Sequence, residues 1–149
     1  MSQVILRAAT LDDADRLLRW RNDTDAVRFS RSGRAVAAAE HRSWLSAALA
    51  GSSTRVWVAV DRGIPVGEVR LDLHGDEAEV DIAVDPASRG HGVASAMLAD
   101  LQTSLDSLEV KRLVAHVHRD NVASRRLFTS ARFQLAGEVG DFLILGWPM

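Results

Sequence analysis

The sequence predicts a mixed α/β fold, in which helices cover both faces of one central sheet. Apolar residues alternate over several short runs, as in strands, and recur at helical spacing over others. The helical runs lie between strands instead of gathering at one end, which favours a mixed sheet. The 149 residues contain no repeat, low-complexity segment or interior linker, so we expect one domain over residues 1–149.

The N-terminal third predicts a strand followed by two helices. The strand covers residues 4–9, and Thr10 with an acid three residues later resembles a capping box. The first helix should then bury Leu11, Ala14, Leu17 and Leu18. Residues 20–23 break this regularity, and residues 30–34 form a polar loop. The second helix covers residues 37–50, with an apolar face of Trp44, Leu45, Ala48 and Leu49 and with Gly51 as its stop.

The remaining elements follow in the order strand, strand, strand, helix, strand, helix, strand, strand. We expect strands over residues 55–61, 65–73 and 79–84, then a helix from Val93 whose apolar positions extend to Leu108. A strand over 112–118 and a helix over 122–131 come next. Two strands, 133–139 and 142–146, form a terminal hairpin across Gly140 and Asp141.

The segment Arg89-Gly90-His91-Gly92-Val93-Ala94 is the most informative for function. It follows a strand that Asp85-Pro86 ends, and it opens an amphipathic helix. Glycines at such a turn allow the backbone to approach a ligand, and a helix N-terminus binds phosphate or pyrophosphate. Neither the Walker A spacing nor the last glycine of a dinucleotide fingerprint is present. A glycine-rich turn without a ligand is the alternative.

A second segment follows about thirty residues later. It begins Asn121-Val122-Ala123-Ser124, continues to Leu127-Phe128, and precedes Phe133. Together the two segments resemble the GCN5-related N-acetyltransferases, the GNAT superfamily, over residues 79–133. Phe128 stands where many relatives have Tyr, and Ala131-Arg132 replaces the usual small glycine turn.

The resemblance implies the GNAT fold, a mixed and mostly antiparallel sheet of about six or seven strands, and acetyl-CoA as cosubstrate. It also implies that a backbone N–H of the strand before the loop polarises the thioester carbonyl. The residues it assigns to the cosubstrate lie on that strand, on the loop with the start of its helix, and on the second motif: Ile82, Ala83, Val84, Arg89, Gly90, His91, Gly92, Val93, Ala94, Ser95, Asn121, Ser124, Leu127 and Phe128.

Strand alternation selects the candidates for a general base. Glu68, Asp81 and His116 lie on polar strand faces, which would surround the thioester if those faces line one cleft. The alternative for each is a salt bridge, for example with Arg70 beside Asp81 or Glu79. We expect His91, His41 and His74 at the surface, and no metal site, because the histidines lack ligand spacing.

Residues 18–45 carry the signal for the acceptor. Trp20-Arg21-Asn22-Asp23 and Glu40-His41 with Trp44 resemble the subgroup that acetylates amino-sugar nucleotides, such as the N-acetyltransferase of the pseudaminic-acid pathway. Arg21 and Asn22 would then contact the substrate, and Trp44 would stack on a sugar or base. The alternative places both tryptophans in the core and Arg21 in a surface ion pair. Ribosomal-protein N-terminal acetyltransferases share much of this pattern.

Composition limits the class of protein. A net charge of −2 does not indicate nucleic-acid binding, and the absence of cysteine excludes disulfides and thiolate nucleophiles. The N-terminus has no long apolar run, so we expect neither a signal peptide nor a membrane span, and a cytoplasmic monomer or homodimer. The chain also lacks tyrosine, which relatives often use as a general acid near the CoA sulfur.

We therefore expect an N-acetyltransferase that moves the acetyl group directly from acetyl-CoA to a primary amine. An amino-sugar nucleotide is the first choice of acceptor. The alternatives are a protein N-terminus, a small amine such as an antibiotic, and a non-catalytic acyl-CoA-binding regulatory module.

Overall fold

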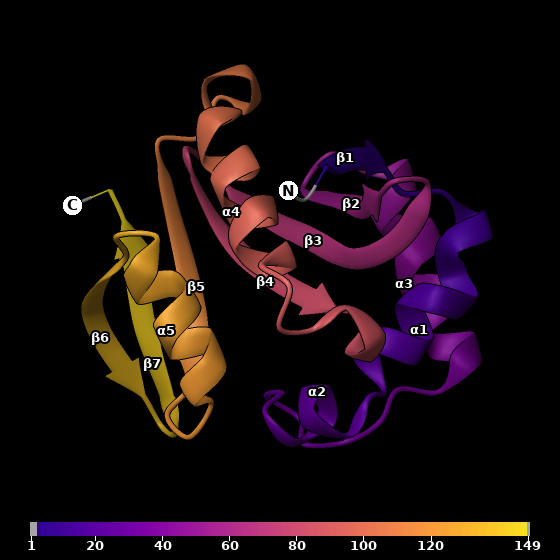
Figure 1. The fold of residues 1–149 in the computed structure, drawn as a ribbon, viewed down its shortest axis with the longest axis horizontal. Helices are drawn as coiled ribbons and strands as arrows, with labels where there is room; N and C mark the ends of the chain where they lie inside the picture. The colour runs from indigo at the N-terminus through magenta and orange to yellow at the C-terminus, as the bar shows by residue number, and fades with distance from the viewer. Residues whose placement is uncertain (1–2, 149) are drawn as a thin grey trace.

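The computed structural model describes residues 3–148, which form one seven-stranded sheet with helices packed on both of its faces (Figure 1). The strands are β1 (Val4–Ala8), β2 (Thr54–Asp61), β3 (Ile64–His74), β4 (Glu77–Val84), β5 (Arg112–His118), β6 (Gln134–Val139) and β7 (Phe142–Trp147). The helices are α1 (Ala14–Arg21), α2 (Thr24–Arg28), α3 (Ala38–Ala50), α4 (Val93–Thr103) and α5 (Val122–Ser130), with 3-10 turns η1 (Leu11–Asp13), η2 (Pro86–Ser88) and η3 (Asp106–Leu108).

The sheet has the strand order β1-β2-β3-β4-β5-β7-β6, and every neighbouring pair except β4 and β5 is antiparallel. The parallel pair is short. Its register joins Glu77–Glu79 to Arg112–Val114 and then stops, although both strands continue. The sheet therefore splits at its centre, and the gap between the ends of β4 and β5 is visible in Figure 1.

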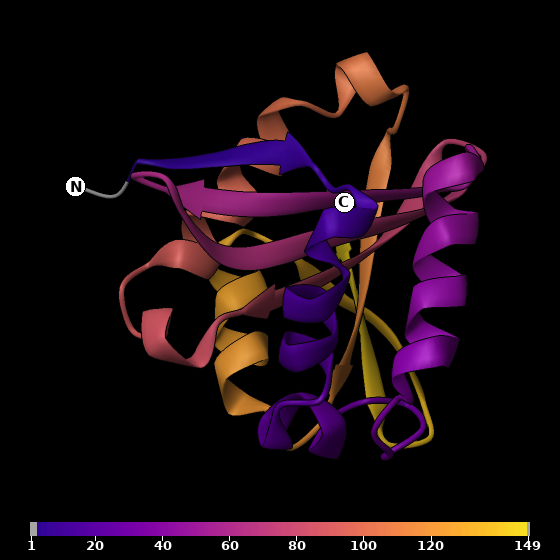
Figure 2. The same ribbon diagram turned by 90° about the vertical axis from the view of Figure 1, so that its right-hand side faces the viewer.

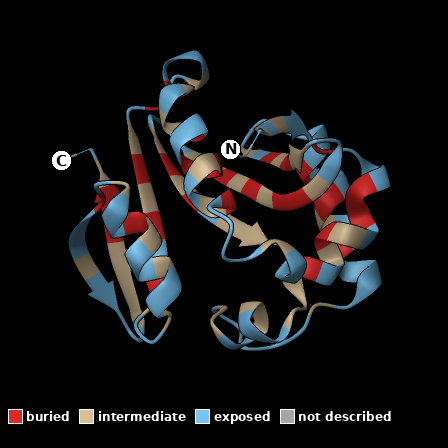
Figure 3. Ribbon diagram, viewed as in Figure 1, coloured by how far each residue is buried: buried red, intermediate tan, exposed pale blue. Residues whose placement is uncertain are grey.

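Two apolar clusters hold the layers together. The larger one packs α4 and α5 on one face of the sheet through residues such as Met97, Leu101 and Phe128. The smaller one packs α1 and α3 on the opposite face through Trp20 and Leu45, as the turned view in Figure 2 illustrates. Figure 3 shows that burial follows the strands and the inward sides of these helices.

The close approach of α4 to the sheet depends on Gly67 in β3. A Cβ at this position would lie 2.6 Å from the Ala83 carbonyl oxygen and 3.0 Å from the Met97 side chain. Any larger residue would therefore push α4 away from the strand that precedes it.

The predicted element order is confirmed, and the predicted strands agree with the observed ones to within about two residues. The capping box at Thr10 is also confirmed, although it opens η1 before α1. Leu11 is exposed because η1 turns it outward. The short helix α2 was not predicted, since residues 24–28 carry no apolar periodicity long enough to detect.

Two helix ends differ from the prediction. Gly51 follows α3 in an extended conformation, with φ −94° and ψ −174°, so it is not a left-handed stop. The helix from Val93 ends at Thr103, and Leu105 and Leu108 reach the core from the turn that follows. Between residues 3 and 148, no helix has both the length and the apolar character needed to cross a membrane.

Candidate active site

The split in the sheet leaves one edge of β4 without a partner strand. The Asp85 N–H donates to the Val66 carbonyl of β3 at 2.8 Å. Backbone groups alternate sides along a strand, so the N–H groups of Ile82 and Val84 point to the other edge, where β5 has separated. These donors are available to a ligand that lies in the gap.

The loop after β4 ends at the N-terminus of α4. Asp85 accepts a hydrogen bond from the Ala87 N–H at 2.9 Å, which shapes the turn after the strand. Gly90 and Gly92 have φ values of 80° and 74°, a left-handed conformation that side chains with a Cβ rarely adopt. The first N–H groups of α4, from Val93 onward, have no partner within the helix. The loop therefore fits a pyrophosphate.

The side chain of Arg89 turns toward the N-terminal half. Its Nη2 lies 2.6 Å from Asp23 Oδ2, and its Nη1 lies 3.6 Å from Asp25 Oδ2. The hydrogen bond from Arg89 lowers the pKa of Asp23. Trp20 makes a second link, because its indole N–H donates to Asp85 at 2.7 Å. The loop and the α1–α2 region are thus joined by polar contacts.

A groove of about 450 Å³ runs between α4 and α5. Its lining includes Ser95 and Leu127, two of the residues predicted to contact the cosubstrate. Asn121 begins α5 by accepting a hydrogen bond from the Ser124 N–H at 3.2 Å. Phe128 differs from expectation, because its ring is buried against Phe133 with centroids 5.0 Å apart and does not line the groove.

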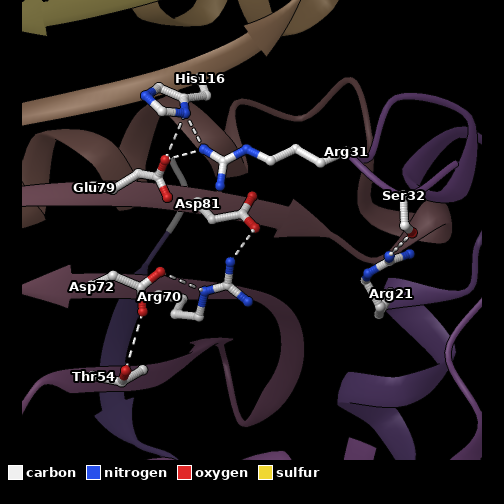
Figure 4. A network of polar contacts seen from close by, with 9 residues as sticks. All are labelled: Arg21, Arg31, Ser32, Thr54, Arg70, Asp72, Glu79, Asp81 and His116. Carbon is white, nitrogen blue, oxygen red and sulfur yellow. Dashed lines mark hydrogen bonds and ion pairs between the residues drawn. The ribbon is translucent and has the colours of Figure 1, made fainter. Parts of the chain in front are cut away.

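The face of β3, β4 and β5 that is turned away from α4 and α5 is polar. Glu68 and Arg70 of β3, Asp81 of β4 and His116 of β5 lie on this face, as strand alternation predicted; all but Glu68 are drawn in Figure 4. Arg70 Nη2 donates to Asp81 Oδ2 at 3.2 Å, and its Nε lies 3.6 Å from Asp72 Oδ2. The salt bridge considered for Asp81 is therefore present.

Glu68 differs from the other acids on this face. Its side chain is half-buried between Val58 of β2 and Ala83 of β4, and it has no hydrogen-bond partner among residues 3–148. Burial raises the pKa of Glu68 to about 7, and the charge of Asp81 acts in the same direction, whereas Arg70 opposes it. This carboxyl can accept and release a proton near neutral pH.

His116 is held where β4 and β5 separate. Its Nδ1 lies 2.8 Å from Glu79 Oε1, and Arg31 contacts both side chains (Figure 4). Arg31 comes from the segment between α2 and α3, so three distant parts of the chain meet here. Arg31 was not predicted as a site residue, because nothing in the loop pattern indicates which strand it reaches.

The residues expected to contact the acceptor lie near this face, but most of their polar groups are already occupied. The Asn22 side chain accepts from the Val36 N–H at 2.8 Å and donates to the Val36 carbonyl at 2.9 Å. Arg21 Nη2 donates to Ser32 Oγ at 3.4 Å. Asn22 therefore holds the end of α1 and the residues just before α3 together, and its contact with substrate stays a prediction. Trp44 is half-buried, with the Arg70 guanidinium 5.3 Å from its ring centroid.

His41 is buried, and the prediction of a surface position was wrong. Its side chain shares the inward face of α3 with Leu45 and Ala48, because positions 41, 45 and 48 are one and two helical turns apart. Burial lowers the pKa of His41, and the nearby charges of Arg21 and Arg70 lower it further. The imidazole is therefore neutral at pH 7.

The arrangement combines three chemical capabilities. The loop and the start of α4 offer N–H donors to phosphate, the free edge of β4 offers N–H donors to a carbonyl oxygen, and Glu68 offers a proton acceptor on the opposite face. Between residues 3 and 148, no group of three or more His, Asp or Glu side chains could hold a metal ion.

Comparison with known proteins agrees with this arrangement. A family model for the acetyltransferase (GNAT) domain matches residues 3–134. A domain from Methanocaldococcus jannaschii has a TM-score of 0.87 to this chain at 21% identity, covering 98% of each chain. An aminoglycoside acetyltransferase in complex with coenzyme A has a TM-score of 0.82 at 21% identity, covering 97% of this chain and 94% of that one. The ribosomal-protein-alanine N-acetyltransferase from Brucella melitensis has a TM-score of 0.76 at 25% identity, covering 95% and 96%. No curated protein matches the sequence.

Proposed function

The chain belongs to the GNAT family of acetyltransferases, and on that premise we propose that it acetylates the primary amine of an amino sugar carried as a nucleotide. As a family member, the chain is an acetyl-CoA-dependent N-acetyltransferase. Acetyl-CoA supplies an acetyl thioester, whose acyl carbon forms a new bond to the amine nitrogen as the bond to sulfur breaks. The acceptor is the part of this function that we propose.

The observation that supports direct transfer to an amine is the free carboxyl of Glu68. An amine at neutral pH is mostly an ammonium ion and must lose a proton before it can attack. Glu68 is half-buried, lacks a hydrogen-bond partner among residues 3–148, and has a pKa of about 7 because of burial and the nearby charge of Asp81. We assign it the role of general base, acting directly or through a water molecule.

The other two candidates for the base have competing partners. Asp81 is paired with Arg70, and His116 is paired with Glu79. Ionised Asp81 raises the proton affinity of Glu68. We therefore assign Asp81 an electrostatic role.

On the opposite face, the chain holds the donor. The backbone N–H of Ile82 points to the free edge of β4 and would donate to the thioester oxygen, so that step needs no side chain. The loop around Gly90 and Gly92 would hold the pyrophosphate, and the groove that includes Ser95 and Leu127 would hold part of the remaining molecule.

Two features support an amino sugar as the acceptor. The polar face of β3, β4 and β5, which carries Glu68, is the face proposed for the acceptor, and we call it the acceptor face. Polar and aromatic side chains, among them Trp44 and Arg21, gather near it, and such a mixture suits a sugar ring. A neighbour of the same fold is an aminoglycoside acetyltransferase.

The test is acetyl transfer to a panel of amines. The purified chain is supplied with acetyl-CoA and with UDP-glucosamine, an aminoglycoside, or a peptide that begins with alanine, and N-acetylated product is measured by mass spectrometry against a no-amine control. We expect the nucleotide sugar to give the highest kcat/KM. Faster acetylation of the peptide would contradict the amino-sugar proposal and favour a protein N-terminus.

A further inference from the structure

The segment of residues 21–34, which covers the acceptor face, has an uneven distribution of charge. It contains four arginines, at positions 21, 28, 31 and 34, and two aspartates, at positions 23 and 25. Both aspartates lie within ion-pair distance of Arg89 in the loop after β4, at 2.6 Å and 3.6 Å. The acids of the segment are thus directed away from its arginines.

The arginines have little negative charge to balance them. Among the residues that the structure describes, Arg21, Arg28 and Arg34 form no ion pair with a carboxylate. Arg21 Nη2 instead donates to neutral oxygens of Ser32 and Arg34, and the Arg28 guanidinium lies 4.8 Å from the ring centroid of Phe29. Residues 21–34 therefore present an excess of positive charge.

Arg31 connects this excess to the reaction site. Its guanidinium contacts Glu79 and His116, at the point where β4 and β5 separate, and 58% of its side-chain surface is exposed (Figure 4). An ion pair this exposed contributes little stability. A ligand oxyanion that meets the planar guanidinium with two hydrogen bonds can therefore replace Glu79 as its partner.

The position of Arg31 relative to Glu68 constrains the ligand. Glu68 pairs with Ala83 across β3 and β4, whereas Arg31 lies at the level of Glu79, four residues earlier on β4. Four residues of strand span about 13 Å, and both side chains can shorten this gap. The carboxylates on the polar face of β3 and β4 repel an anion. An oxyanion would therefore bind on the side of Arg31 that is turned toward its own segment, residues 21–34, while the amine faces Glu68.

We propose that Arg31 is a specificity-determining residue that binds an oxyanion, phosphate by first choice, on an acceptor whose amine lies several ångströms away. The proposal rests on the proposed function, since it names a second chemical group on the same acceptor. Phosphate suits the site because its oxygens match the planar fork of guanidinium donors, and its negative charge suits the unbalanced positive charge of residues 21–34.

Two measurements test the proposal. In the first, kcat/KM is compared for UDP-glucosamine, glucosamine 1-phosphate and glucosamine, a series in which the amine stays constant, the first two sugars carry phosphate and the third carries none. In the second, UDP is titrated calorimetrically while coenzyme A is saturating, so that the loop after β4 is already filled. The variants are Arg31→Gln, Arg31→Lys and the control Arg55→Gln, an exposed arginine on β2 whose neighbour Val56 packs in the α1–α3 cluster.

We expect the phosphorylated acceptors to exceed glucosamine at least tenfold in kcat/KM. Arg31→Gln should abolish that preference and weaken UDP binding at least tenfold. Arg31→Lys keeps the charge but not the planar fork of donors, so it should reduce the preference and the UDP affinity less than Arg31→Gln does. Arg55→Gln should match the wild type. Equal use of all three sugars, or UDP binding that is unchanged in Arg31→Gln, overturns the proposal.

The outcomes separate this proposal from the function on which it rests. If no amine is acetylated but UDP binding still depends on Arg31, the amino-sugar function fails and the oxyanion site stands. If glucosamine and its phosphorylated forms are acetylated equally, the acceptor is an amino sugar that needs no nucleotide, and the oxyanion site fails. Stronger use of the monophosphate than of UDP-glucosamine would identify a phosphate monoester as the natural group.

Discussion

Replacement of Glu68 by glutamine removes one ionisable group and keeps the shape of the side chain. Since Glu68 is assigned as the general base, we expect Glu68→Gln to lower kcat by about 10²–10⁴-fold, the usual contribution of general acid–base catalysis. The pKa of about 7 also predicts that ionisation of Glu68 makes wild-type kcat/KM rise with pH until about pH 7 and adds no further rise above it. The variant should lack that inflection.

The same substitution should raise stability, and the magnitude follows from the pKa. A rise from 4.5 to about 7 corresponds to a cost of up to about 3 kcal/mol for holding the carboxylate in its folded position. The folded state binds this proton more tightly than the unfolded state does. The cost is therefore absent below pH 4.5, grows between pH 4.5 and pH 7, and is complete above pH 7.

Urea unfolding at pH 5 and at pH 8 measures this effect. We expect Glu68→Gln to be more stable than the wild type by up to about 3 kcal/mol at pH 8, and by much less at pH 5. Glu138→Gln, at an exposed position on β6, is the matched control and should change neither activity nor stability. A variant that keeps its activity and its pH inflection would refute the assignment of the base. A stability difference that is the same at both pH values would refute the claim that the pKa of Glu68 is raised in the folded protein.

Three further predictions concern other parts of the chain. Gly92→Val places a β-branched residue at φ 74° in the loop and should raise the acetyl-CoA Kd at least tenfold, about 1.4 kcal/mol. The control Gly75→Val, with a similar φ in a distant hairpin, should leave the Kd unchanged. Equal Kd values for the two variants would remove the loop from the site. Asp13→Asn should cost about 2 kcal/mol at pH 7, because a hydrogen bond from Arg7 holds the Asp13 pKa at about 2, and unfolding curves should show this loss shrinking between pH 4 and pH 2. Asn22→Ala should raise the acceptor KM with acetyl-CoA affinity unchanged, since it releases the segment between α2 and α3; an unchanged KM would show that this segment does not contribute.

The parts of the site that were predicted from the sequence are those formed by neighbours in the chain. The loop that we propose for the pyrophosphate is a continuous run of residues, in which Gly90 and Gly92 mark the turn and the spacing from Val93 onward marks the helix. The polar face of β3 and β4 could also be predicted, because strand alternation needs no knowledge of the fold. Asp81 and Arg70 were expected as partners and are 3.2 Å apart.

The parts that could not be predicted depend on contacts between distant segments. Arg31 reaches Glu79 across 48 positions and His116 across 85, and no local pattern encodes such a meeting. Asn22 was expected to contact the acceptor because residues 20–23 resemble the amino-sugar subgroup, and its hydrogen bonds to the Val36 backbone, 14 positions away, could not be predicted. His41 was expected at the surface from its residue type alone, although its helical spacing with Leu45 indicates burial.

The absence of tyrosine affects the last step of the reaction, in which the thiolate leaves. Phe128 occupies the position expected for the missing phenol, but its ring is buried against Phe133 and does not line the groove between α4 and α5. A thiol such as that of cysteine has a pKa of about 8.5, so protonation of the leaving thiolate at pH 7 is favourable by about 2 kcal/mol without any side-chain acid. Under the proposed assignment, the proton transfer that needs a side chain is therefore the removal of a proton from the amine by Glu68, and departure of the thiolate needs none.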